Sequence, residues 1–302
     1  MPLFHRSDGT LVRDLPAFRR ILPYLMRRRN ESAVFIDMRV DVTRTRKWIR
    51  AVNRASGSEP CTLLHLFCYV LSRVVADFPE LNRFVSGRRV YQRRTATASL
   101  VVRESLTPNS APYTVKVPAA EPEEVLPHYA RRLSAILRNA REFQKSTERE
   151  IELVMRLPDP LVRLAVWARD KLDEWNLLPG FMIRNDPMYT TVFVAEMKSL
   201  ALPGTFHHLY ECGTCGLFAV IAAREREPGP GGAGSEGARD IVPIRWTVDE
   251  RIADGALMAT ALQRIRSWLE DPAGAFGPPE QAGRGKSQAG VLDAPEPACS
   301  LS

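Results

Sequence analysis

The 302-residue sequence predicts an α/β fold in which a large mixed β-sheet is flanked by helices. The main observation is that two kinds of segment are interspersed along the chain. In one kind, apolar and polar residues alternate as in a strand, and in the other, apolar residues recur every three to four positions as in a helix. The second observation is the composition, which is 45% hydrophobic and can therefore bury a sizeable core.

The expected elements are distributed over most of the chain. Strands are expected at 33–42, at 88–91 and 95–103 (a hairpin after Gly87), and at 113–117, 189–195, 217–223 and 241–248, and helices at 43–53, 62–78, 122–143, 147–157, 161–174 and 257–269. Thr43 has the side chain of an N-cap, and Gly57 follows the helix that begins there. Pro79 and Pro158 end helices because proline lacks the backbone N–H that a helix interior needs.

The two ends and one internal segment differ in composition from the rest of the chain. Residues 1–32 are rich in arginine and are expected to form an arm that packs on a neighbouring subunit or on the domain edge. Residues 227–240 are rich in Gly and Pro, which predicts a flexible hairpin loop. Residues 271–302 consist largely of Pro, Gly, Ala, Gln and Ser, which predicts a disordered tail. The folded domain is therefore expected at 33–270.

Composition also excludes some classes of function. The net charge is +7, but the basic residues are interleaved with acids and no basic stripe carries stacking aromatic residues, so nucleic-acid binding is not expected. The longest apolar run contains Arg73 and Asp77, which predicts a buried helix and not a membrane span. Five cysteines form no regular framework and there is no secretory leader, so a cytoplasmic protein is expected.

The stretch 244–269 combines a strand, a charged turn and an amphipathic helix. The turn is 249–255 (DERIADG), and its acids include Glu250 and Asp254. A turn between two elements that are anchored in a core can hold charged groups rigidly at the rim of a pocket. The same acids at the start of a helix also suit the helix dipole, so a purely structural role stays open.

This turn resembles the D-H-R-x-x-D-G turn in the catalytic domain of the 2-oxoacid dehydrogenase acyltransferases, and the related HxxxDG of chloramphenicol acetyltransferase. The segment 78–82 (FPELN) resembles the F/H-P-E-L-N of the same family. The resemblance covers about 33–269. The chain is similar to small stand-alone members of the family, and no part of it resembles a lipoyl domain. It implies a chloramphenicol acetyltransferase-like two-layer fold, with 33–270 as the catalytic domain, and a homotrimer whose active site lies between subunits. It also implies a coenzyme A thioester as acyl donor.

The resemblance further indicates which groups carry the chemistry and where this sequence departs from the family. Glu250 occupies the position of the family's general-base histidine, and Ala195 that of the serine that donates a hydrogen bond to the oxyanion. Asp254 matches the aspartate that holds the turn through an ion pair with an arginine. Both groups that act directly in the family are therefore absent from their expected places.

Several residues are open to two interpretations. Glu250 is either a replacement base or a structural acid of the turn. His208, in the pair His207-His208, is a second candidate base, although a histidine in such a connection can equally well be a structural hydrogen-bonding group. Cys212 and Cys215 form a lone CxxC, for which a redox or zinc site competes with two small buried residues. No metal site is assigned.

Three functions are compatible with these residues. The first is an acyltransferase that moves an acyl group between coenzyme A and an unknown small-molecule acceptor. The second is a catalytically inactive binding or scaffold homologue that lacks the family's histidine and serine. The third is a redox or metal module built on the CxxC. We favour the acyltransferase-like interpretation, while the residues leave open whether the chain is active.

Overall fold

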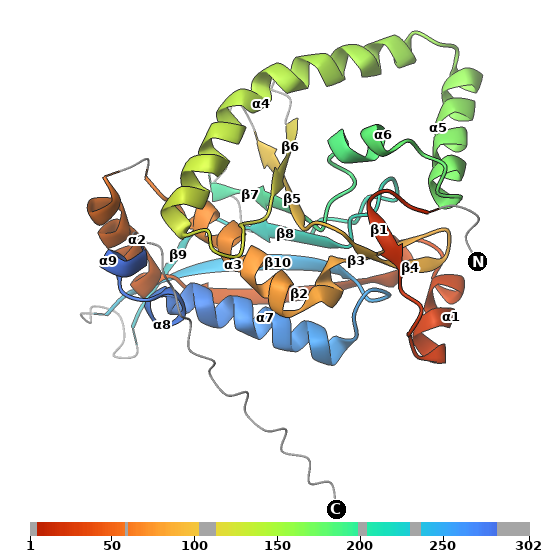
Figure 1. Ribbon diagram of the computed structural model, residues 1–302. Helices are drawn as coiled ribbons and strands as arrows, with labels where there is room; N and C mark the ends of the chain where they lie inside the picture. Colours follow the sequence, from red (N-terminus) through yellow and green to blue (C-terminus); the bar gives the residue numbers. More distant parts are fainter. Residues whose placement is uncertain (1–4, 58–59, 103–112, 199–203, 230–236, 283–302) are drawn as a thin grey trace, which may run out of the picture.

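The computed structural model describes residues 5–57, 60–102, 113–198, 204–229 and 237–282 (Figure 1). The helices are α1 (Ala17–Leu25), α2 (Thr43–Ser56), α3 (Leu63–Asp77), α4 (Leu126–Met155), α5 (Asp159–Glu174), α6 (Gly180–Asn185), α7 (Gly255–Glu270), α8 (Pro272–Phe276) and α9 (Pro279–Ala282), with short 3₁₀ turns at Asn30–Ser32 and Pro79–Asn82. The strands are β1 (Gly9–Leu11), β2 (Ala33–Asp41), β3 (Arg83–Ser86), β4 (Arg89–Arg93), β5 (Thr97–Val102), β6 (Tyr113–Pro118), β7 (Val192–Glu196), β8 (Leu217–Ile221), β9 (Glu225–Glu227) and β10 (Arg239–Asp249).

The strands form one large mixed sheet and one small sheet. The large sheet is seven-stranded with the order β2-β10-β8-β7-β5-β6, and β9 pairs with the start of β10. Strands β5, β7 and β8 are parallel, whereas β2, β10 and β6 pair antiparallel with their neighbours. Strands β1, β4 and β3 form the small antiparallel sheet. The large mixed sheet flanked by helices confirms the predicted fold class.

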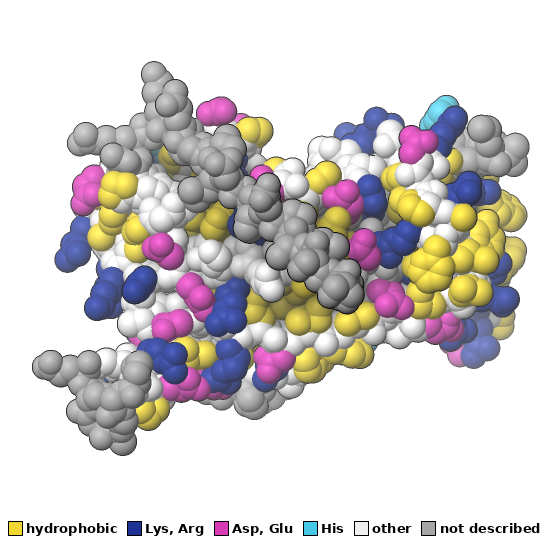
Figure 2. Space-filling model, turned by 90° about the horizontal axis from the view of Figure 1, so that it is seen from below, with side chains coloured by type: hydrophobic (Ala, Val, Ile, Leu, Met, Phe, Trp, Pro, Cys, Tyr) yellow, Lys and Arg dark blue, Asp and Glu magenta, His cyan; other side chains and the backbone are white. Residues whose placement is uncertain are grey.

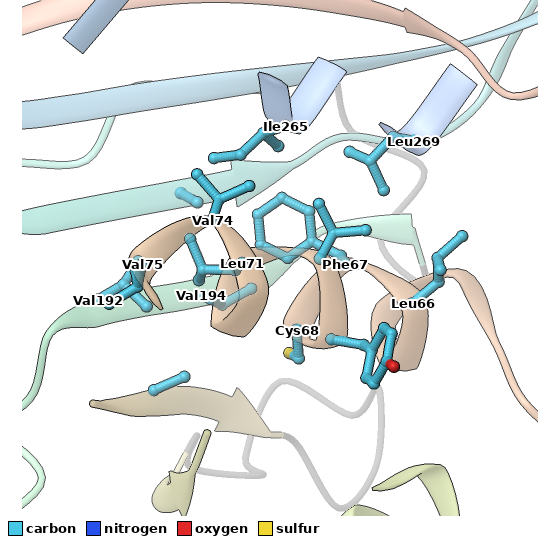
Figure 3. Close-up of a cluster of buried hydrophobic side chains, with 14 of the residues drawn as sticks. Leu66, Phe67, Cys68, Leu71, Val74, Val75, Val192, Val194, Ile265 and Leu269 are labelled. Atoms are coloured by element: carbon cyan, nitrogen blue, oxygen red, sulfur yellow. The ribbon is translucent and has the colours of Figure 1, made fainter. Parts of the chain in front are cut away.

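Helices α2, α3, α4 and α7 cover one face of the large sheet, which we call the inner face (Figure 1). Helix α3 lies at the centre of this layer and is hydrophobic over most of its surface, which is typical of a helix buried on several sides. Figure 3 shows Val74 of α3 pointing toward Ile265 of α7. It also shows Val75 of α3 beside Val192 of β7. The core therefore joins α7 to the sheet through α3.

The opposite face of the sheet, the outer face, is covered by the segment 204–216 and by α6. Phe193 and Phe218 lie on this face because successive residues of a strand point to opposite faces of its sheet. Their rings stack at a centroid distance of 5.6 Å and pack with Leu209 and Cys215 in a second, smaller core. The connection before β8 is thereby fixed onto the sheet.

The described part of the N-terminal region packs on the edge of its own chain. Strand β1 pairs with β4, so the arm extends the small sheet. The Arg6 guanidinium is buried and bonds the carboxylates of Asp8 and Asp173, both at 2.7 Å. This ion-pair network joins the arm to the end of α5.

The prediction of a hairpin between 88–91 and 95–103 is wrong. Strand β4 pairs with β3 and β1, whereas β5 enters the large sheet between β6 and β7. The hairpin turn is formed by Gly87 and Arg88, whose φ angles of 52° and 60° are both left-handed. Two positive φ angles are required in a type I′ turn, the tight turn that connects paired strands most readily. The strand before Gly87 is therefore the partner of β4.

The helices expected at 122–143 and 147–157 form one continuous helix, α4. The residues between the two expected segments include no Gly or Pro, so nothing in the chain interrupts the helix there. Figure 1 shows α4 rising away from the sheet, with α5 returning toward the small sheet. The expected break before α5 is present, with Pro158 at its N-cap.

Two expectations at other helix ends also need correction. Thr43 does not cap α2 with its side chain, because the Asp41 carboxylate accepts the Thr43 N–H at 3.0 Å. The disordered tail expected at 271–302 begins instead with two short helices, α8 and α9, and the Trp48 indole N–H donates to the carbonyl of Gly277 between them at 3.1 Å. The rest of that tail, 283–302, and the loop centre at 230–236 lie outside the described residues. Over the described ranges, no helix is both long and apolar enough to cross a membrane.

Candidate functional site

The turn between β10 and α7 is held by hydrogen bonds to α1 and to the 3₁₀ turn that precedes β2. The Glu250 N–H donates to the carbonyl of Ser32 at 3.0 Å, and the Glu250 carbonyl accepts from the Arg19 guanidinium at 3.2 Å. The Glu250 side chain itself is exposed to solvent. The structure therefore fixes the backbone of this residue and leaves its carboxylate accessible.

The buried acid of this turn is Asp249, the last residue of β10. Its carboxylate accepts hydrogen bonds from the Arg251 guanidinium at 2.7 and 2.8 Å and from the Ser32 hydroxyl at 2.9 Å. Arg251 also donates to the carbonyl of Met26 at 3.0 Å. Asp249 and Arg251 are 1% and 3% exposed, so each is the counter-charge that the other needs in a dry environment.

Asp254 does not have the expected ion pair. Its side chain is exposed and caps α7, with the carboxylate accepting the Leu257 N–H at 2.8 Å. Among the described residues no arginine pairs with it. The ion pair belongs to Asp249 because the end of β10 points this side chain inward, whereas the N-cap position of a helix lies at its exposed start.

An apolar groove of about 320 Å³ runs between β2 and α7, beside Glu250. Its lining includes the apolar residues Val34, Ile36, Met38, Val248, Ala253, Met258 and Leu262. Glu250 and Asp254 stand at the end where α7 begins, and Arg39 and Arg266 stand toward the other end. Figure 2 views the molecule from the side of β2 and α7 and shows hydrophobic side chains gathered along the middle of this face. The groove can accept an apolar chain, with a carboxylate at one end.

The paired histidines lie on the outer face of the sheet. The Thr247 hydroxyl donates to the carbonyl of His207 at 2.6 Å, and the His207 ring stacks on Phe218 at 4.1 Å. His207 Nδ1 lies 2.7 Å from the carbonyl of His208, so Nδ1 carries the proton and Nε2 is left as an acceptor. Burial lowers the pKa of His207, which favours the neutral ring.

His208, the histidine named as candidate base from the sequence, is exposed, and its ring is bonded to no described residue. Its ring stacks on that of His207 at 4.5 Å. Of the pair, His207 has the fixed tautomer and the neutral ring that a base needs. The sequence does not distinguish the two, because their difference arises from packing on Phe218.

The CxxC cysteines lie in different environments. Cys215 is 1% exposed, its Sγ lies 3.1 Å from the carbonyl of Leu217, and burial raises its pKa to about 11. Cys212 is half-buried and contacts the Arg169 guanidinium. The described cysteines are free, and no group of three or more metal-ligating side chains occurs in the described ranges. Cys215 is thus a small buried core residue, which was one of the two interpretations of the CxxC.

One constellation that the sequence analysis did not identify joins Thr62, His65 and Ser134. His65 Nε2 lies 3.1 Å from the Ser134 hydroxyl, the arrangement of a nucleophile and its base. However, His65 Nδ1 accepts the Thr62 N–H at 3.0 Å, so the ring proton is on Nε2 and is donated to Ser134. His65 therefore cannot take the serine proton, and its Nδ1 contact with the Thr62 N–H belongs to the capping box of α3.

The comparison with solved structures identifies the fold. A probable dihydrolipoamide acetyltransferase from Listeria monocytogenes aligns over 87% of this chain and 95% of its own, with a TM-score of 0.54 and 16% identity. The dihydrolipoamide acetyltransferase of Azotobacter vinelandii aligns over 87% and 93%, with a TM-score of 0.54 and 14% identity. A chloramphenicol acetyltransferase aligns over 86% and 99%, with a TM-score of 0.50 and 13% identity. The chain has a chloramphenicol acetyltransferase-like fold.

These similarities concern the acyltransferase-like fold alone, because the sequence identities are low. The comparison with protein-family models finds no match, and neither does the comparison with curated protein sequences. Activity, substrate and catalytic residues therefore have to be argued from the residues of this chain.

Within this acyltransferase-like fold, the two positions taken from the resemblance lie far apart. Ala195 of β7 is level with Val220 of β8, which is level with Arg245 of β10. Glu250 follows Arg245 by five residues, which is about 16 Å along an extended strand. Ala195 and Glu250 of one chain therefore do not face a common reacting atom.

Proposed function

We propose that this chain binds the acyl group of a coenzyme A thioester in the groove between β2 and α7 and transfers it to a small-molecule acceptor. The observation that carries the proposal is the apolar groove of about 320 Å³ with the accessible carboxylate of Glu250 at one end. A mainly apolar cleft with a few polar groups is the usual form of a small-molecule site, and this volume lies within the common range. The apolar lining is suited to an apolar acyl chain.

In this proposal Glu250 is the general base. Its carboxylate accepts the proton of the acceptor as the acceptor attacks the thioester carbonyl carbon. The carbon–sulfur bond then breaks, and the leaving thiolate takes the proton from Glu250. The hydrogen bonds from the Glu250 N–H to Ser32 and from Arg19 to the Glu250 carbonyl hold this residue at the mouth of the groove.

The proposal includes assembly as a homotrimer, the state that the resemblance implies. Large apolar side chains with more than half of their surface exposed occur on α1, β2, α4, α5 and α6 or just after α5: Phe18, Tyr24, Leu25, Phe35, Met155, Leu164, Val166, Trp167, Trp175 and Phe181. Exposed apolar area on this scale marks an interaction surface. The Glu250 and Ala195 positions of one chain are far apart, which agrees with the active site between subunits that the resemblance implies.

A second candidate function is binding without turnover. Ala195 has no group that can donate to an oxyanion, and removing one such donor from a known enzyme costs about 3–4 kcal/mol of transition-state stabilisation. The Glu250 carboxylate is also exposed to solvent and is not enclosed in the groove. These two observations favour a homologue that keeps the groove and has lost catalysis.

The two candidates are distinguished by measuring binding and turnover separately. Calorimetric titration with octanoyl-coenzyme A and with free coenzyme A tests the groove, and thiol release in the presence of amine and alcohol acceptors tests transfer. Ala259→Trp places a large ring in the groove and should abolish octanoyl-coenzyme A binding. The matched control is Thr260→Trp, at an exposed neighbouring position of α7 outside the groove lining, which should bind like wild type.

Glu250→Gln should remove turnover and leave the affinity for octanoyl-coenzyme A nearly unchanged, because it deletes only the proton acceptor. Turnover in this variant equal to wild type would exclude Glu250 as the base. Binding without turnover in the wild type would establish the second candidate. Absence of binding to the wild type would overturn both.

A further inference from the structure

Helix α2 exposes a row of four cations, which we call the α2 basic face: Arg44, Lys47, Arg50 and Arg54. With 3.6 residues per turn, their spacing of three to four residues places them along one side of the helix. None of the four forms an ion pair with a described carboxylate, whereas Arg46 on the same helix pairs with Asp240. Figure 1 shows α2 at one end of the molecule beside α9, away from the turn that carries Glu250.

These charges do not stabilise the helix that carries them. The first turn of α2 has no acid, and Arg44 there opposes the positive end of the helix dipole. Arg44 and Lys47 are three residues apart, and Arg50 and Arg54 are four apart, so neighbouring like charges repel one another. Arg54 alone suits the helix dipole, in the last turn. The stability of α2 therefore does not account for the α2 basic face.

The side chains that α2 exposes indicate which kind of anionic partner fits the α2 basic face. The aromatic and large aliphatic residues of α2, including Trp48, Ile49 and Val52, are buried in the core, so no aromatic ring is available to stack on a nucleic-acid base. For the same reason no large apolar side chain can insert into a lipid surface. What remains is a row of cations that extends about 15 Å along one side of the helix. Such a row matches the carboxylates on one side of an acidic helix.

We propose that the α2 basic face docks an acidic helix of a partner protein. Glutamates spaced three to four residues apart on that helix meet Arg44, Lys47, Arg50 and Arg54 in turn. Arginine guanidinium groups bind carboxylates through two parallel hydrogen bonds, which gives the contact a preferred register. The docking does not depend on the acyl-transfer proposal, because the basic face lies on a different element from the groove.

The test uses the full chain and two fluorescein-labelled alanine-based helical peptides. One peptide carries four glutamates along a single face at a spacing of three to four residues, and the other carries glutamine at the same positions. In fluorescence anisotropy at physiological salt, the glutamate peptide should bind at least about tenfold more tightly than the glutamine peptide, since complementary charge dominates this contact. Raising the salt concentration should weaken it steeply.

The variant Arg44→Gln/Lys47→Gln/Arg50→Gln/Arg54→Gln should lose at least about tenfold in affinity for the glutamate peptide. It should melt at or above the wild-type temperature because the like-charge repulsion in α2 is removed. The control Arg20→Gln/Arg131→Gln/Arg156→Gln/Arg163→Gln removes the same charge from exposed positions elsewhere and should bind within about twofold of wild type. Equal losses in the two variants would overturn the proposal, and so would tighter α2-dependent binding to a DNA duplex or to phosphatidylserine vesicles.

Discussion

At the scale of single residues, two acids of the turn after β10 have different roles. The ion pair with an arginine, which the resemblance implied for Asp254, is made by Asp249 instead. Asp249 holds the Arg251 guanidinium in the protein interior, and Asp254 caps α7 at the surface. Burial decides how much each contributes to stability. Removing one partner from a buried ion pair leaves the other charge uncompensated, whereas an exposed N-cap can be replaced by water at small cost.

We therefore expect three different melting behaviours from the acids of this turn. Asp249→Asn should lower the free energy of unfolding by about 3–5 kcal/mol, because the Arg251 guanidinium stays buried without its counter-charge. Asp254→Ala should lower it by about 1 kcal/mol through loss of the cap. Glu250→Gln should unfold like wild type, since its carboxylate is exposed. Urea unfolding of the three variants measures this order, and an Asp254→Ala variant less stable than Asp249→Asn would refute it.

At the scale of elements, one lysine on β6 anchors α6 to the outer face of the sheet. Lys116 Nζ donates to the carbonyls of Ile183, Arg184 and Asp186 at 3.2, 3.2 and 3.3 Å. These carbonyls lie at the end of α6, where the helix dipole attracts a cation. Burial, with a smaller contribution from Arg93, lowers the pKa of Lys116 to about 8.

The lowered pKa of Lys116 predicts a pH-dependent stability. Between pH 8 and 10.5 the folded chain has lost the Lys116 proton while the unfolded chain still holds it, so the free energy of unfolding gains a contribution that rises with pH. Lys116→Arg should lack this contribution because its guanidinium stays protonated. The difference in unfolding free energy, wild type minus variant, should therefore increase across this range in chemical denaturation. A difference that does not change with pH would show that Lys116 titrates normally.

At the scale of the whole molecule, the apolar stripe of α1 lies next to the turn that carries Glu250. Phe18 and Leu25 are 71% and 66% exposed, and Arg19 on the same helix donates to the Glu250 carbonyl. We expect sedimentation to show a trimer at micromolar concentration. Phe18→Glu/Leu25→Glu should dissociate it, because burying two carboxylates in an apolar interface is unfavourable. Arg20→Glu, on the same helix, is the control and should stay assembled. A monomeric wild type would contradict the trimer.

The elements that depend on local pattern were predictable from the sequence. The alternation at 241–248 and the helical spacing at 257–269 correspond to β10 and α7. Helix α7 buries Met258, Ala261, Leu262, Ile265 and Leu269, which recur at the three-to-four-residue spacing of one helix face. Periodicity predicts these elements because the geometry of a strand or a helix determines which side chains share a face. The turn at 249–255 followed from the same pattern.

Only the tertiary structure decided which strands pair and what each charged residue does. The separation of β4 from β5 into two sheets depends on partners distant in sequence. The same is true of the hydrogen bonds that Ser32 makes to Asp249 and that Arg251 makes to Met26. The same holds for His207, whose ring stacks on Phe218 and whose pKa is lowered by burial. The physical reason is that burial and counter-charges are set by contacts between distant segments, whereas a short stretch of sequence specifies only its own periodicity and caps.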